Sequence, residues 1–484
     1  MKMKSIIAVA AMFVAATAFG ALRAVSHDQW GGKPDSWQMK RHAEKMSVVT
    51  NGGAKVVFIG DSITHFWESR GKAQLQKYFS QGDWKMLNLG TSADRTEHVL
   101  WRLNEGRELD GYEAKCVLLM IGTNNSGHFP FAKEPPSDAI LGIREIIRTI
   151  RAKQPKAKIV LTAIFPRGAG QTDATRLRND VVNREIARFA DGKNVFWCDF
   201  GARLVDAAGD TKWVMPDRLH PGPQGYEIWY ESVKPFIEYA LSDGSKPAPK
   251  NLFNGAPTPA EKGPATVRPA TRSKRGDATQ ADWWLDRLLR NRRQIADSNG
   301  KIDLVFFGDS ITHNWEGPGK ASLAKLRKTY SVLNIGYGGD RTQHLVWRGE
   351  NGELDGYEAK CVMLMIGTNN SRSDSPEDVA LGIRRILDII ASKQPNAKTL
   401  LLPIFPRGAS ADNKLRKNNE KVNAIVKNYA DGKKVVWVDF NSKFLDANGD
   451  TKWIMRDRLH PNAKGYSDIW MPAVLPYFRE ACGK

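Results

Sequence analysis

KVVFIGDSITH, at residues 55–65, joins an apolar run to a glycine-bounded turn, and a close copy, IDLVFFGDSITH, occupies residues 302–313. A serine that follows a buried strand and opens a helix can be exposed at the carboxyl edge of a parallel sheet, where ligands bind. Ser62 and Ser310 are therefore candidate nucleophiles. Taken alone, Gly-Asp-Ser fits a tight turn and a helix cap equally well. The motifs that follow in the same order favour catalysis.

The chain contains one unit twice, from about residue 55 to 240 and from about 302 to 481. The run LDGYEAKCV is identical at residues 109–117 and 354–362. A period this long predicts tandem domains. The expected parts are a signal peptide at 1–20, a first domain at 21–241, a mobile linker rich in Pro, Ala, Thr, Lys and Gly at 242–280, and a second domain at 281–484.

Within each copy, short apolar runs alternate with amphipathic helical patterns, such as the one over residues 138–154. Strands alternating with helices predict right-handed crossovers and a parallel sheet covered on both faces, which is an α/β class with three layers. In the first copy the expected strands are 55–59, 85–89, 115–121, 158–164 and 195–199.

The composition is that of a globular protein, with 41% hydrophobic and 26% charged residues in 484, enough for two cores. The net charge of +19 favours anionic partners such as acidic glycans or membrane surfaces, with nucleic acid last. A solvated basic surface fits at least as well, because the basic residues are dispersed. We therefore expect no nucleic-acid partner.

The N-terminus has the pattern of an export signal, with Lys2 and Lys4 before the apolar residues 6–18 and a small-residue site at 18–20. We expect a periplasmic or extracellular protein with no membrane span after cleavage, and an uncleaved anchor is the alternative. Four cysteines do not make a disulfide framework, and no Cys/His cluster has metal-ligand spacing, so no structural zinc is predicted.

Three further motifs follow the predicted strands. NLGTSADRT at 88–96 and NIGYGGDRT at 334–342 are turns that can aim a backbone N–H at an oxyanion. GTNN at 122–125 and 367–370 offers a side-chain amide, although asparagine is also a common loop residue.

DRLHP at 217–221 and 457–461 places an aspartate three residues before a histidine. On a turn, this spacing lets the carboxylate hold one imidazole nitrogen while the other faces the serine. An aspartate cap beside a packed histidine would explain the motif if it stood alone. Its repetition after the other three motifs predicts serine-ester hydrolysis.

These four motifs resemble those of the SGNH, or GDSL, hydrolases. The runs DRTQHLVWR at 340–348, GTNN at 367–370 and IFPRG at 404–408 are similar to the branch that contains the platelet-activating-factor acetylhydrolase catalytic subunits. The resemblance covers nearly all of each copy. It implies two flavodoxin-like domains with five-stranded parallel sheets, no cofactor, and ester hydrolysis through an acyl-enzyme.

By position in these motifs, the resemblance implies a catalytic residue set and an oxyanion hole in each copy. The catalytic sets are Ser62, Asp217 and His220, and Ser310, Asp457 and His460; the oxyanion donors are the N–H of each serine, the N–H of Ala93 and Gly339, and the side chains of Asn124 and Asn369. Ala93 departs from the glycine usual in the family. If this position needs a positive φ, alanine there is strained, so the second copy is expected to be the more active.

Three functions compete. Removal of short acyl groups, above all acetyl, from carbohydrate fits export and the basic charge. Hydrolysis of lipid or phospholipid esters fits the resembled branch. A module that binds acylated glycans with little turnover is the third, and a small-molecule or glycan ester is the expected ligand in each case.

Other polar and aromatic residues near the motifs have open roles. Arg167 and Arg407 can hold an anionic substrate group or form structural ion pairs, and Trp30 and Trp37 can bind sugar or pack a lead-in helix. His65, His98, His313 and His344 are expected to be structural or substrate-orienting. The two copies can also pair as an intramolecular pseudo-dimer.

Overall fold

The computed structural model describes residues 23–27, 36–127, 134–272, 276, 278 and 282–483. The expected signal peptide at 1–20 and Trp30 lie outside the described residues. The chain divides into two compact units, residues 1–260 with 273–285, and residues 261–272 with 286–484.

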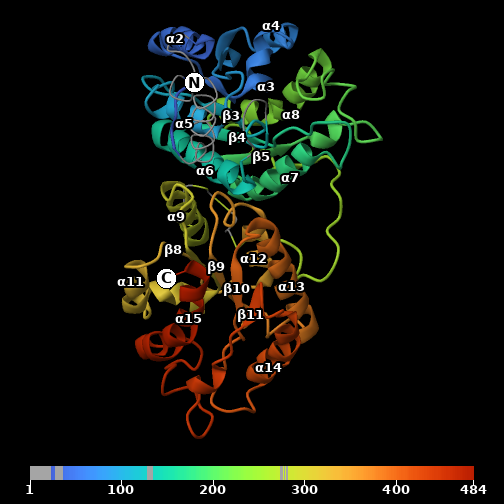
Figure 1. The fold of residues 1–484 in the computed structure, drawn as a ribbon. Helices are drawn as coiled ribbons and strands as arrows, with labels where there is room; N and C mark the ends of the chain where they lie inside the picture. Colours follow the sequence, from blue (N-terminus) through green and yellow to red (C-terminus); the bar gives the residue numbers. More distant parts are fainter. Residues whose placement is uncertain are drawn as a thin grey trace, which may run out of the picture. The chain divides into compact units, whose positions relative to one another are not determined.

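The first unit is built on a parallel sheet in the order β2-β1-β3-β4-β5-β6. Figure 1 labels strands β3, β4 and β5 of this sheet. Its strands are β1 (Val56–Gly60), β2 (Met86–Asn88), β3 (Cys116–Met120), β4 (Lys158–Thr162), β5 (Val195–Asp199) and β6 (Leu252–Phe253). Helices α5, α6 and α7 pack side by side, while α8 packs on α4 and on strands β3 to β5. The helices are α2 (Trp37–Thr50), α3 (Ser62–His65), α4 (Lys72–Tyr78), α5 (Thr96–Asn104), α6 (Pro136–Lys153), α7 (Ala174–Ile186) and α8 (Pro223–Leu241).

The second unit repeats this plan with a sheet in the order β11-β10-β9-β7-β8, again all parallel. Its strands are β7 (Leu304–Gly308), β8 (Val332–Gly336), β9 (Cys361–Met365), β10 (Lys398–Leu401) and β11 (Val435–Trp437). The helices are α9 (Trp283–Asp297), α10 (Ser310–His313), α11 (Lys320–Arg327), α12 (Thr342–Glu350), α13 (Pro376–Lys393), α14 (Lys414–Val426), a π-helical turn (Gly465–Trp470) and α15 (Met471–Cys482). The prediction of an α/β fold with parallel sheets is confirmed.

The central strands form because every side chain on them can be buried. All five residues of β1 and all five of β7 are buried, as expected of strands covered on both faces by helices. Aromatic rings fill one side of each core, with Trp67 and Trp229 against Phe58 in the first unit. Trp315 and Trp470 pack on each other in the second unit.

The segment between the copies, expected to be a mobile linker, makes defined contacts in places. Leu252 and Phe253 form a sixth strand beside β5, so the prediction of five strands is correct for the second sheet and one too few for the first. Residues 261–272 belong to the second unit. A two-residue strand is too short to produce a hydrophobic period, which is why composition alone indicated a linker here.

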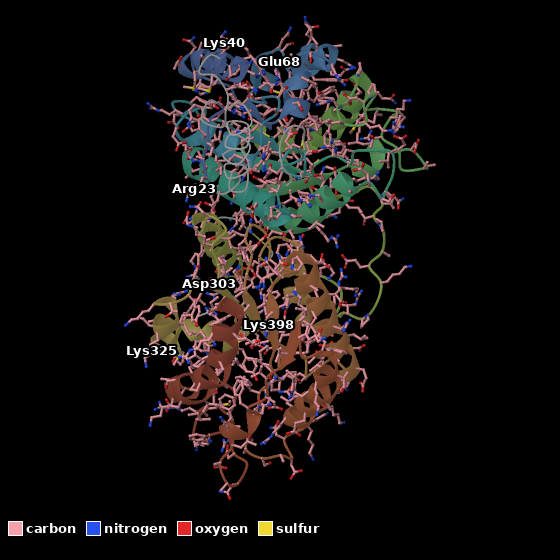
Figure 2. The ribbon with its side chains drawn as sticks, in the orientation of Figure 1. Arg23, Lys40, Glu68, Asp303, Lys325 and Lys398 are labelled. Atoms are coloured by element: carbon pink, nitrogen blue, oxygen red, sulfur yellow. The ribbon has the colours of Figure 1, made fainter. Side chains whose placement is uncertain are left out.

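One buried arginine on each lead-in helix makes an equivalent set of contacts. Arg41 of α2 donates to Glu68 over 2.8 Å and to the carbonyl oxygens of Asn88 and Gly90; Glu68 is labelled in Figure 2. Arg287 of α9 makes the same contacts with Glu316, Asn334 and Gly336. Both helices therefore brace the carboxyl end of the second strand of their sheet. Within the described residues, no helix has the length and apolar character needed to span a membrane.

Candidate active site

The candidate nucleophile stands at a sharp strand-to-helix turn. Ser62 is the first residue of α3, directly after β1 and the capping Asp61, whose Oδ1 accepts from Ile63 N over 2.9 Å. A Cβ on Gly60 would collide with the Thr64 side chain and the Met120 carbonyl, so only glycine fits before the turn. The same turn holds Ser310 after β7, where Asp309 Oδ1 accepts from Ile311 N over 3.0 Å.

The aspartate of this turn is fully buried in both copies. Burial raises the pKa of Asp61 and of Asp309 to about 7, partly offset by the backbone hydrogen bond that each accepts. A neutral carboxyl can remain in place beside the serine without adding charge to the turn.

In the first copy the structure brings the predicted serine, histidine and aspartate together. Ser62 Oγ lies 2.9 Å from His220 Nε2, and His220 Nδ1 lies 2.9 Å from Asp217 Oδ2. The other oxygen of Asp217 accepts the backbone N–H of His220 over 2.7 Å. A carboxylate that holds the proton on Nδ1 leaves Nε2 as the acceptor that faces the hydroxyl.

The second copy repeats this chain of contacts. Ser310 Oγ lies 2.8 Å from His460 Nε2, and His460 Nδ1 lies 2.6 Å from Asp457 Oδ2. The pKa of Asp457 is lowered: burial acts against this, but the ring and backbone hydrogen bonds from His460 outweigh it. The carboxylate is therefore charged at neutral pH and can stabilise an imidazolium.

The predicted oxyanion residues lie on two loops that are joined by a hydrogen bond. Asn124 Nδ2 donates to the carbonyl oxygen of Asp94 over 2.7 Å, and Asn369 Nδ2 donates to that of Asp340 over 2.8 Å. Each asparagine is thus fixed beside the residue that follows Ala93 or Gly339. One amide N–H of each asparagine is used in this way, and the second N–H is available to a ligand oxygen.

Ala93 and Gly339 share a left-handed backbone. Their φ angles are 70° and 73°, so the position does require a positive φ. Glycine adopts this conformation without cost, whereas for alanine it costs about 1 kcal/mol or more. The strain expected of Ala93 is therefore present in the first copy.

His220 of the first copy has two neighbours that His460 does not have. The ring of Phe66 packs on His220 at 4.9 Å between centroids, and Arg70 covers Phe66 and pairs with Asp217 Oδ2 over 3.0 Å. Burial lowers the pKa of His220, Asp217 raises it, and the charges of Arg70 and Arg167 lower it further. The equivalent positions in the second copy hold Asn314 and Pro318.

The histidines outside the catalytic sets have structural contacts. His98 Nδ1 and His344 Nδ1 accept the backbone N–H of Arg95 and Arg341 at the start of their helices. His65 Nδ1 lies 2.9 Å from Ser92 Oγ, and the exposed ring of Trp37 stacks on His65 at 5.8 Å. Burial lowers the pKa of His65 and of His313 to about 4, so both rings are neutral at pH 7.

The two arginines after the fourth strand hold the asparagine loop. Arg167 Nη1 donates to Thr123 Oγ1 over 3.2 Å, and Arg407 Nη1 donates to Thr368 Oγ1 over 3.1 Å. These contacts support a structural role and do not test the alternative of substrate binding.

One group of metal-ligating atoms occurs among the described residues. His27, Asp94 and His98 are buried with ligand atoms within 4.8 Å of one another, a grouping that sequence spacing did not reveal. Arg102 already binds Asp94 Oδ2 through Nε and Nη2 at 3.0 and 2.6 Å. The carboxylate is therefore neutralised by a guanidinium of the protein itself.

Sequence reasoning missed the segments that precede the lead-in helices. Val25 N donates to Glu97 O, and Ala270 N donates to Gln343 O, both over 3.2 Å at equivalent positions. The only signal is the weak match between RAVSH at 23–27 and RPATR at 268–272.

Comparisons with known proteins agree on the type of fold and chemistry. The profile of the GDSL-like lipase/acylhydrolase family matches residues 58–228 and 306–467. The human platelet-activating factor acetylhydrolase IB subunit alpha2 is 33% identical over 211 residues, which are 43% of this chain and 88% of that protein. The alpha1 subunit from Pongo abelii is 35% identical over 185 residues, covering 37% of this chain and 77% of the relative.

Solved structures with a similar fold include two bacterial proteins. A GDSL-like lipase from Bacteroides thetaiotaomicron is 20% identical with a TM-score of 0.36, over 42% of this chain and 98% of that one. An acetylxylan esterase from Geobacillus stearothermophilus is 19% identical with a TM-score of 0.32, over 38% of this chain and 94% of that one.

Proposed function

Because this chain belongs to the GDSL-like lipase/acylhydrolase family and is an ester-hydrolysing enzyme, we propose that both copies are serine esterases that remove short acyl groups, above all acetyl, from carbohydrate. The observation that carries the proposal is the contact of serine, histidine and aspartate within 2.6–2.9 Å in each copy. We propose further that the protein is exported.

The proposed mechanism follows from these contacts. His460 takes the proton of Ser310 Oγ through Nε2, and the alkoxide attacks the ester carbonyl. The N–H groups of Ser310 and Gly339 and the amide of Asn369 stabilise the oxyanion. His460 then protonates the leaving alcohol, and water releases the acid from the acyl-enzyme by the same steps. Ser62, His220 and Asn124 have these roles in the first copy.

Exposed tryptophans support a carbohydrate substrate. Trp213 and Trp453, at equivalent positions four residues before the aspartate of each catalytic set, are 45% and 52% exposed. Trp37, stacked on His65, is 47% exposed. Flat aromatic faces with a polar edge suit sugar rings, and a burial site for a long acyl chain would instead call for aliphatic side chains.

The second candidate is hydrolysis of a lipid ester. It is favoured by the identity of 33% to a platelet-activating factor acetylhydrolase subunit. Both candidates use the same chemistry, so they differ in acyl length and in the alcohol that leaves.

The test compares p-nitrophenyl acetate with a p-nitrophenyl ester of a long acid, and acetylated oligosaccharide with a short-chain phospholipid. Wild type, S62A, S310A and the double variant are assayed. We expect turnover of the acetyl esters by wild type and its loss in the double variant. A preference for the phospholipid would favour the second candidate, and folded wild type that binds acetylated glycan without turnover would favour a binding module.

A further inference from the structure

A segment that precedes the second lead-in helix reaches the turn with the expected oxyanion donor. We call residues 261–272 the strap. Thr266 is buried, and its Oγ1 donates to the carbonyl oxygen of Asp378 over 2.7 Å. Ala270 N donates to Gln343 O at the start of α12. The carbonyl oxygen of Thr266 lies where a side chain at Gly382 of α13 would begin, so the strap packs directly against this helix.

The last residue of the strap lies on the oxyanion turn. The Arg272 guanidinium donates to the carbonyl oxygen of Gly338, and a Cβ on Gly339 would overlap its Nη1. The guanidinium therefore occupies the space that the methyl group of Ala93 fills in the first copy. The side chain is exposed at this point, so it can meet a ligand as well as the turn.

The first copy uses the equivalent segment differently. Val25 makes the contact of Ala270, but two residues later the chain has His27 in place of Arg272. His27 turns inward, with Nε2 at 2.7 Å from Asp94 Oδ1 and its ring stacked on His98. Only 8% of His27 is exposed, so its ring does not reach the surface of the turn as Arg272 does.

Two further arginines of the second copy differ from their counterparts in exposure or in residue type. Arg341 is 37% exposed and is hydrogen-bonded to Ser373, with Asp374 at 4.0 Å, whereas its counterpart Arg95 is buried against Glu97 and Glu134. Arg372 is exposed where the first copy has Gly127. Burial lowers the pKa of Arg407, and the nearby charge of Arg372 lowers it further.

We propose that Arg272 forms an anion-binding subsite at the second active site, and that this site selects acyl esters of acidic carbohydrates. A guanidinium pairs with a carboxylate through two parallel hydrogen bonds, which suits a uronic acid next to the acylated sugar. The first site, with Ala93 and an inward His27, accepts neutral sugars. This division of substrates rests on the proposed carbohydrate-esterase function.

The test measures kcat/KM on acetylated oligogalacturonate and on neutral acetylated xylo-oligosaccharide. The S62A variant isolates the second site, and S310A isolates the first as the matched control. The preference is the ratio of kcat/KM on the acidic substrate to kcat/KM on the neutral one. It should be about 10- to 100-fold lower in S62A/R272A than in S62A, because one charge-assisted pair is lost, and S62A/R272K should have an intermediate ratio. S310A should prefer the neutral substrate.

Binding provides a readout that does not depend on turnover. Unacetylated oligogalacturonate is titrated into S62A/S310A with and without R272A, and we expect weaker binding with R272A. An unchanged preference together with unchanged binding would overturn the subsite. Loss of turnover on all esters by folded S62A, with binding still dependent on Arg272, would overturn the esterase function of the second copy and leave the anion site.

Discussion

The two copies have the same catalytic contacts in different surroundings. Ala93 and Gly339 both adopt a φ near 70°, so the fold imposes this conformation whichever residue occupies it. The first copy keeps the turn at the cost of strain and covers His220 with Phe66 and Arg70. The second has an unstrained glycine with Arg272 against it. The contacts among serine, histidine and aspartate are therefore kept in two different surroundings, and we expect the copies to differ in rate and substrate.

The largest expected effect comes from the serines. S62A/S310A should lose about 10⁶-fold in kcat on p-nitrophenyl acetate, because neither copy can then form an acyl-enzyme. S310A should lose more of the total rate than S62A, since the second copy carries no strain at the oxyanion turn. A greater loss of rate in S62A than in S310A would show that the first copy is the more active one. Circular dichroism checks that the variants are folded.

Much of this architecture could be predicted from the sequence because it depends on local patterns repeated twice. Apolar runs before GDSITH are β1 and β7, and the spacing Asp217-x-x-His220 fits a turn in which the carboxylate reaches the ring. The order of the motifs along the chain matches the order of strands whose carboxyl ends share one edge.

The missed features depend on contacts between distant residues. Nothing in the neighbourhood of Arg70 indicates that it reaches Asp217, 147 positions later in the chain. The strand Leu252–Phe253 and the strap are short extended stretches that obtain their partners from the finished fold. A low-complexity composition can therefore coexist with fixed contacts when an existing surface supplies the order.

Removal of an oxyanion amide is the next largest effect. N369A in the S62A background and N124A in the S310A background should each lower kcat about 10²- to 10³-fold, as expected for one lost donor. Both variants also lose the hydrogen bond to the carbonyl of Asp340 or Asp94, so thermal unfolding is measured alongside. Full activity in either variant would exclude that asparagine from the mechanism.

Exchange of the turn residues tests the difference in strain directly. A93G should raise kcat/KM of the first site by up to about fivefold, because about 1 kcal/mol of strain lowers the population of the donating turn by roughly that factor. G339A should lower kcat/KM of the second site by a larger factor, since the new methyl group would also overlap the Arg272 guanidinium. In S62A/G339A, the further change R272A should restore part of the loss. Equal rates for all of these variants would show that strain at the turn does not limit turnover.

The smallest expected effect is a displacement of the pH profile of the first site. Only neutral His220 can act as base, and burial together with Arg70 and Arg167 lowers its pKa below the ordinary 6.5. Activity of S310A should therefore persist below pH 6.5. R70A removes one cation and frees Asp217 Oδ2 for the ring, and both changes raise the pKa of His220 and move the acidic limb of kcat/KM to higher pH. The second site has Pro318 at the position of Arg70 and so has no such cation there. Substitution of Pro318 should therefore leave the pH profile of S62A unchanged. If R70A leaves the acidic limb of S310A unmoved, then Arg70 acts on packing alone.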